Sequence, residues 1–115
     1  MPAVRAPERG DVMWLQFNPQ AESEQSGRRP ALVISPRSYN QRVGLAILCP
    51  ITSRIKGYPF EVELPQGMKT EGAILCDQIK SLDWRVRNAK RIGSVPLAVM
   101  QEVTARILAI VDPEE

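Results

Sequence analysis

The chain has 115 residues, of which 43% are hydrophobic and 24% are charged, and its formal net charge is +2. These values are typical of one globular domain and exclude an intrinsically disordered, collagen-like or coiled-coil protein. The longest apolar runs, such as residues 45–51, are far shorter than the ~20 residues of a membrane-spanning helix. The N-terminus has no apolar signal region, so we expect a cytoplasmic protein.

Short apolar segments separated by turn residues predict a mainly β protein. Residues 1–9 are polar and contain two prolines, which predicts a flexible arm at the start of a single domain spanning 1–115. The predicted strands are 10–17, 30–34, 45–51, 60–64, 72–76 and 90–95, with one helical turn at 37–42 and a segment of unassigned structure at 78–82. The segment 60–64 alternates strictly, which predicts that Glu61 and Glu63 share a face in water.

The last segment, 96–111, changes to helical spacing. Its apolar stripe, which we interpret as core or as a contact between two copies, consists of Val99, Met100, Val103, Ile107 and Ile110. Short, closely spaced strands followed by one amphipathic helix predict a small closed or half-open barrel, with the helix packed against it.

Charge is unevenly distributed along the chain. Residues 28–91 hold 12 basic and 5 acidic side chains, a net charge of +7, whereas the two ends together carry −5. No acidic residue occurs between Arg28 and Phe60. This pattern favours a polyanionic partner, either a nucleic acid or an acidic peptide. Scattered, solvated charges are the alternative interpretation.

The chain contains no histidine. This absence excludes Ser-His-Asp and Cys-His nucleophile systems and histidine-based metal sites. The two cysteines, Cys49 and Cys76, are too few for a structural zinc site, and each lies in an apolar run, which indicates buried free thiols. Any catalysis must therefore use carboxylates, Arg, Lys, Tyr or hydroxyl groups, and we expect neither a metal nor a cofactor.

A set of sequence blocks occurs in one order and at one spacing. The blocks are GDVMW at 10–14, ESEQSGRRP at 22–30, VISP at 33–36, PITS at 50–53, KGYPFEV at 56–62 and DQIKSLDWR at 77–85. Together they cover roughly residues 9–111 and resemble the MazF/PemK (Kid) family of toxin endoribonucleases from type II toxin–antitoxin systems. Position 28 is an arginine where some members of that family carry a histidine.

The resemblance implies an SH3-like barrel of the CcdB/PemK type and a homodimer. It implies metal-independent, sequence-specific cleavage of single-stranded mRNA, which halts translation and arrests growth. It also implies a MazE-like antitoxin whose acidic, disordered tail covers the site. Carried over by position, Glu24 and Arg29 match the catalytic pair of the family, and Thr52 matches a hydroxyl beside them.

The chemistry of RNA cleavage fits these residue types. RNA supplies its own nucleophile, the 2′-hydroxyl, so the protein needs a base, a cation at the phosphate and a proton for the leaving oxygen. Glu24 is a plausible base, and the fork of Arg29 can bind two phosphate oxygens at once. A guanidinium with a pKa above about 12 is a weak proton donor, so Arg29 is expected to stabilise the phosphorane. Thr52, or a water that it holds, could share the proton transfer.

Further residues are predicted to bind RNA. Three cations are expected to contact RNA phosphates: Arg28 and Lys56 belong to the acid-free stretch that ends at Phe60, and Lys80 follows it. The side chains with donors and acceptors suited to base edges are Gln25, Ser53 and Gln78. Tyr58 and Trp84 are expected to stack on unpaired bases, whereas Trp14 is interpreted as core or as a contact between copies.

Other interpretations remain open from the residues alone. Glu24 could be a solvated loop carboxylate, Arg29 a structural ion-pair partner and Thr52 a turn hydroxyl. The chain could also be a CcdB-like gyrase poison without catalytic activity, or an SH3-like module that binds RNA or peptide. Incubation with a long RNA in EDTA separates these functions, because only the endoribonuclease produces discrete fragments.

Overall fold

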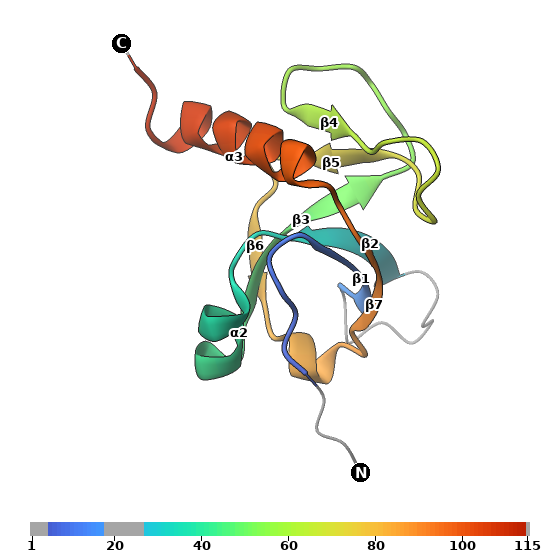
Figure 1. Cartoon of the computed structure of the whole chain (residues 1–115), viewed down its shortest axis with the longest axis vertical. Coiled ribbons are helices and arrows are strands. Elements are labelled where there is room, and N and C mark those ends of the chain that lie inside the picture. Colours follow the sequence, from blue (N-terminus) through green and yellow to red (C-terminus); the bar gives the residue numbers. More distant parts are fainter. Residues whose placement is uncertain (1–4, 18–26, 115) are drawn as a thin grey trace.

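The computed structural model describes residues 5–17 and 27–114. Its elements in chain order are β1 (Asp11–Gln16), β2 (Arg28–Val33), α2 (Arg37–Val43), β3 (Ala46–Thr52), β4 (Glu61–Glu63), β5 (Ala73–Leu75), β6 (Lys80–Leu82), a 3₁₀ helix (Trp84–Val86), β7 (Lys90–Ser94) and α3 (Leu97–Val111) (Figure 1). The predicted strands and the predicted C-terminal helix are thus confirmed, and β6 and the 3₁₀ helix are additions to them.

The strands form one antiparallel sheet in the order β4-β5-β3-β2-β1-β7, and β6 pairs separately with β3. Strand β3 is the centre of this arrangement. Its first residues pair with β6, its middle pairs with β2 (Ala31↔Pro50), and its last residues pair with β5 (Ile51↔Ile74). Both faces of β3 are buried, one in each of the two hydrophobic clusters, which explains why its sequence is almost continuously apolar. Within the described residues β4 and β7 form the two edges, so the predicted barrel is half-open.

Two hydrophobic clusters occupy the two faces of the sheet. Alternation along a strand divides its side chains between them: Val12 belongs to the cluster under α3, and the next residue, Met13, belongs to the other. Helix α3 packs on the first cluster through Val99, Met100 and Val103. The sequence stripe is confirmed for these three residues, whereas Ile110 at its end is 40% exposed.

The segment before β1 differs from the predicted flexible arm. Ala6 and Pro7 are buried, and the carbonyl of Pro7 accepts a 2.9 Å hydrogen bond from the side-chain amide of Asn40. Arg9 donates to the carbonyl of Ile34 at 2.7 Å. Long-range hydrogen bonds therefore hold residues 6–9 against the domain. No helix among the described residues is long and apolar enough to span a membrane.

Candidate active site

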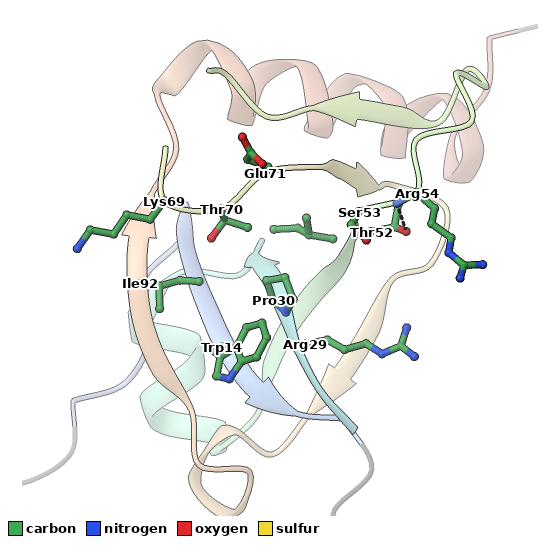
Figure 2. A pocket seen from close by; sticks show the side chains of 11 residues that line it. Trp14, Arg29, Pro30, Thr52, Ser53, Arg54, Lys69, Thr70, Glu71 and Ile92 are labelled. Atoms are coloured by element: carbon green, nitrogen blue, oxygen red, sulfur yellow. Dashed lines mark hydrogen bonds between the residues drawn. The ribbon is translucent and has the colours of Figure 1, made fainter. Parts of the chain in front are cut away.

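A pocket of about 910 Å³ opens on the same face of the sheet as α3, in the part of that face that the helix does not cover (Figure 2). It lies between the sheet and the turn that joins β4 to β5. Its lining residues are Trp14, Arg29, Pro30, Ile51, Thr52, Ser53, Arg54, Lys69, Thr70, Glu71 and Ile92. The lining combines an apolar floor, several hydroxyl groups and three cations, a composition suited to a ligand with flat apolar faces and negative charges.

Strand pairing builds the apolar floor. Trp14 of β1 lies opposite Pro30 of β2 in the register, two positions along each strand from the buried pair Val12 and Leu32. Alternate residues of a strand share a face, so Trp14 and Pro30 lie on the same face of the sheet as Val12 and Leu32. Helix α3 covers that face at Val12 and Leu32 but not at Trp14 and Pro30. The Trp14 ring is half-buried and faces the pocket. The interpretation of Trp14 as core is therefore wrong.

Thr52 stands where β3 ends, at the rim of the pocket. Its side-chain oxygen accepts a 3.1 Å hydrogen bond from the main-chain N–H of Arg54, which fixes the turn that leaves the strand (Figure 2). The turn-hydroxyl interpretation is thus correct, and it is compatible with a place in the site, because the hydroxyl proton stays available to the pocket. Glycine at position 72 lets its main chain lie close to Thr52, because a Cβ there would collide with the carbonyl oxygen of Thr52.

Cations stand at two ends of the pocket. Arg29 and Arg54 extend toward one side in Figure 2, and Lys69 extends toward the other. All three side chains are exposed. Arg29 forms no ion pair within residues 5–17 and 27–114, so nothing in that part of the chain supports a structural ion pair for it. Unpaired guanidinium groups at a pocket mouth are available to a phosphate.

The structure brings together some of the predicted site residues. Arg29, Thr52 and Ser53 line the pocket. Arg28 lies next to it, with its guanidinium carbon 5.9 Å from the centre of the Trp14 ring. Glu24 and Gln25 lie outside the described residues.

The remaining predicted RNA contacts do not line the pocket. Lys56 and Gln78 are exposed beyond its rim. Lys80 is exposed as well, and its ammonium lies 5.9 Å from the centre of the Phe17 ring. These side chains could extend a binding surface outward, but they do not share the pocket with Arg29.

Several lining residues were missed by the sequence interpretation. Arg54 belongs to the acid-free stretch, which was a usable signal. Lys69, Thr70 and Glu71 come from a turn that carries no motif, and only the pairing of β5 with β3 brings them over the site. Among the described residues, no cluster of three acidic or cysteine side chains could hold a metal ion.

Trp84 has a structural position instead of the predicted stacking role. It is 7% exposed, and its indole N–H donates a 3.1 Å hydrogen bond to the carbonyl of Asn40. A ring enclosed in this way cannot receive a base, so the prediction for Trp84 is wrong. The exposed aromatic face at the pocket belongs to Trp14.

Comparisons with known proteins agree with this arrangement. A family model described as PemK-like, MazF-like toxin of type II toxin-antitoxin system matches residues 8–111. The chain belongs to this family. Among its relatives, the protein named Endoribonuclease toxin MazF from Escherichia coli K12 is 43% identical over 105 residues, which cover 91% of this chain and 94% of that protein. Endoribonuclease PemK from Escherichia coli is 33% identical over 108 residues, covering 90% of this chain and 80% of PemK.

Solved structures of PemK/MazF-family toxins share the fold. The crystal structure of MazF from Deinococcus radiodurans matches with a TM-score of 0.83 and 48% identity, covering 92% of this chain and 96% of that one. A second structure from that organism, titled MazE-MazF, matches with the same TM-score at 42% identity, covering 95% and 98%. The fold class, an antiparallel sheet with a C-terminal helix, is therefore that of MazF toxins.

Proposed function

We propose that this PemK/MazF-family chain is the toxin of a toxin–antitoxin pair and a sequence-specific, metal-independent endoribonuclease that cleaves single-stranded mRNA and halts translation. The observation that carries the proposal is the meeting of Arg29, Arg54 and the Thr52 hydroxyl at one pocket with an aromatic floor. The endoribonuclease names of relatives at 33% and 43% identity support it. A gyrase poison would have no need of such a phosphate-binding rim.

The reaction is an internal transfer on the RNA. The 2′-oxygen forms a bond to phosphorus while the bond from phosphorus to the 5′-oxygen breaks. In our proposal Glu24 accepts the proton of the 2′-hydroxyl, and Arg29 binds two oxygens of the phosphorane. The leaving 5′-oxygen takes a proton from the Thr52 hydroxyl or from a water that it holds, and the proton accepted by Glu24 then returns to that donor, so that both groups are regenerated. The products are a 2′,3′-cyclic phosphate and a free 5′-hydroxyl.

The direct test is cleavage of a long single-stranded RNA in the presence of EDTA. We expect discrete fragments with the two ends named above. Arg29→Ala should lower the cleavage rate by about 10²–10³-fold, and Glu24→Ala by about 10²–10⁴-fold. Arg42→Ala is the matched control, because Arg42 is an exposed arginine of α2 that does not line the pocket.

Four outcomes would contradict parts of this assignment. Fragments with 5′-phosphate ends would require a different nuclease mechanism, and so would a strict requirement for Mg²⁺. Absence of cleavage by the wild-type protein would favour the CcdB-like or SH3-like alternative. Unchanged cleavage by Glu24→Ala would remove Glu24 from the role of base.

The predicted RNA contacts divide into two classes. Arg28, Lys56 and Lys80 contact phosphates, so Lys56→Ala should weaken binding to all sequences and reduce the salt dependence by about one contact. Gln25, Ser53 and Gln78 contact base edges, so their replacement should change which sequence is cut. Duplex RNA should be a poor substrate, because pairing hides those edges. A change of cleavage sequence in Lys56→Ala without a change in salt dependence would contradict this division.

The proposed protein partner is an antitoxin with an acidic, disordered tail. The acid-free stretch between Arg28 and Phe60 offers the complementary charge. The Deinococcus radiodurans structure titled MazE-MazF supports the class of partner. Tail and RNA should exclude one another, because both would use Arg28 and Arg29. A titration of RNA-bound Glu24→Ala protein with the tail tests this, and unchanged RNA affinity at saturating tail would contradict direct occlusion.

We also propose a homodimer located in the cytoplasm, where mRNA is available. Several apolar side chains of α3 are exposed and could be covered by a second copy: Leu97, Leu108, Ile110 and Val111. Sedimentation equilibrium checks the dimer, and a mass equal to one chain at micromolar concentration would contradict it.

A further inference from the structure

Glu61 is buried in a place where the sequence pattern predicted water. It is 9% exposed, whereas Glu63 on the same strand is exposed as predicted. Within the described residues no Lys or Arg side chain forms an ion pair with Glu61. A buried carboxylate is costly unless hydrogen bonds compensate it. Its hydrogen-bond partners therefore reveal why the side chain is there.

Those partners are main-chain N–H groups of one loop. Oε1 of Glu61 accepts hydrogen bonds from the N–H of Lys56 at 3.0 Å and from the N–H of Gly57 at 2.8 Å. Oε2 accepts a longer one from Lys56 at 3.2 Å. Gly57 has φ +79°, a left-handed conformation that glycine adopts without strain and that turns two successive N–H groups toward one acceptor.

The same loop has two more long-range contacts. The Tyr58 hydroxyl donates to Asp77 at 2.9 Å, and Arg106 of α3 donates to the carbonyl of Pro59. Residues 53–60 are thus held by β4, by the end of β5 and by α3. Along the chain, the Glu61 contact at Lys56 and Gly57 is the one nearest to Ser53 and Arg54, which line the pocket.

We propose that Glu61 is a positioning residue for RNA binding: it fixes the main chain at Lys56 and Gly57, so that Arg54 is held at the rim of the pocket and Lys56 just beyond it. This proposal rests on the proposed RNA-cleaving function. When single-stranded RNA binds to a mobile loop, part of the binding free energy is lost in ordering the loop. A loop that is already ordered avoids that cost. Glu61 should therefore influence KM and leave the chemical step unchanged.

A pair of substitutions separates the acceptor from the charge. Glu61→Ala and Glu61→Gln both remove one negative charge, but only Gln keeps an oxygen that can accept from both N–H groups. We expect Glu61→Ala to raise KM for single-stranded RNA about tenfold and to change kcat by less than about twofold. Glu61→Gln should stay close to wild type. Glu63→Ala is the control for a lost carboxylate on the exposed face of the same strand.

Amide hydrogen exchange measured by NMR gives a readout that needs no RNA. The N–H groups of Lys56 and Gly57 should be protected in the wild type, and in Glu61→Ala they should exchange at least about tenfold faster. Amides of β1 and β2 should keep their rates. Should Glu61→Ala fail to fold, Glu61→Gln remains informative, because a neutral acceptor should speed exchange at these two amides by about twofold or more.

The outcomes distinguish this proposal from the function on which it rests. Wild-type protein that cleaves no RNA would contradict the function, while the exchange rates would still test the loop contact. Active Glu61→Ala protein with wild-type KM and wild-type exchange rates would overturn the proposal alone. Equally raised KM values in Glu61→Ala and Glu61→Gln would also overturn it. The loss of the negative charge would then explain the change in KM, and the hydrogen-bond acceptor would have no effect.

Discussion

The hydroxyl of Tyr58 donates a 2.9 Å hydrogen bond to the carboxylate of Asp77. This contact joins the loop after β3 to the segment after β5, which carries Gln78 and Lys80. Two stretches that were predicted separately to bind RNA are therefore tied to each other directly. The contact adds to the 2.9 Å hydrogen bond from the main-chain N–H of Cys76 to the carbonyl of Phe60, which joins the same two stretches.

Tyr58→Phe should lower the free energy of unfolding by about 1 kcal/mol, because it removes this hydrogen bond. Burial, together with the hydrogen bond to Asp77, raises the pKa of Tyr58 to about 12. In the unfolded chain Tyr58 has a pKa of about 10. Below that pH the neutral hydroxyl makes its full contribution to the free energy of unfolding, and this contribution is lost as the pH rises toward 12. Urea titrations of both proteins across this range measure it. Tyr39→Phe, at an exposed ring, is the control.

Gly72→Ala should lower the free energy of unfolding by about 3 kcal/mol or more, because the new Cβ meets the Thr52 carbonyl at φ +131°. Gly67→Ala should cost about 1–2 kcal/mol, since φ is +90° there but no atom lies within 4 Å. Chemical denaturation compares the two. Similar losses in both variants would show that the contact with Thr52 is relieved by movement of the turn.

Both cysteines should be inert to thiol reagents in the folded protein. Burial raises the pKa of the Cys49 thiol to about 12 and that of Cys76 to about 11, and both residues are fully enclosed. The thiolate is the reactive form, and its fraction at Cys49 falls about a thousandfold from that of an ordinary thiol. A chromogenic disulfide reagent should react with both thiols in urea. Fast reaction in buffer would contradict the burial.

Arg54→Ala should weaken binding to every RNA sequence and reduce the slope of affinity against salt by about one phosphate contact. The guanidinium stands at the pocket rim, exposed, beside the turn that Thr52 fixes. Arg42→Ala should leave the slope unchanged. Equal slopes for wild type and Arg54→Ala, measured by fluorescence anisotropy, would exclude Arg54 from phosphate contact.

The two tryptophans should respond differently to RNA. Trp84→Phe leaves Trp14 as the single tryptophan, and its emission should be quenched as single-stranded RNA is added. Trp14→Phe leaves Trp84, whose emission should not change, because its ring is buried against Asn40. Quenching in the second variant and none in the first would return the stacking role to Trp84.

Strands and the C-terminal helix could be predicted because local patterning determines them. Val12 and Met13 point to different clusters by alternation, and Val99 and Val103 share one helix face. The family resemblance indicated Arg29 and Thr52, and the side-chain chemistry indicated Ser53; all three lie near the start or the end of strands. These residues come from segments whose position follows from their own neighbours.

What could not be predicted depends on segments that meet only in the folded chain. Alternation assigned Glu61 to a face of β4, but it could not show that the loop at Lys56 folds back over that face. Trp14 stands in an apolar run in the sequence and Trp84 between the charged residues 83 and 85, so the sequence pattern predicted the reverse of their burial. The 3₁₀ helix packs Trp84 against Asn40, and the irregular pairing of β1 with β7 near Val12 and Met13 accompanies the open position of Trp14.

The close approach of Gly72 to Thr52 has a consequence for how the gene can diverge. At this edge of the pocket the main chain of Gly72 lies against the main chain of Thr52, so this one contact does not depend on the side chains around it. Ser53, Lys69 and Thr70 can therefore be exchanged in descendants and shift the RNA sequence that is cut, while position 72 stays glycine. The RNA sequence that is cut can then differ between lineages while the main chain stays the same. A deep mutational scan should find that positions 53, 69 and 70 tolerate substitution and that position 72 does not.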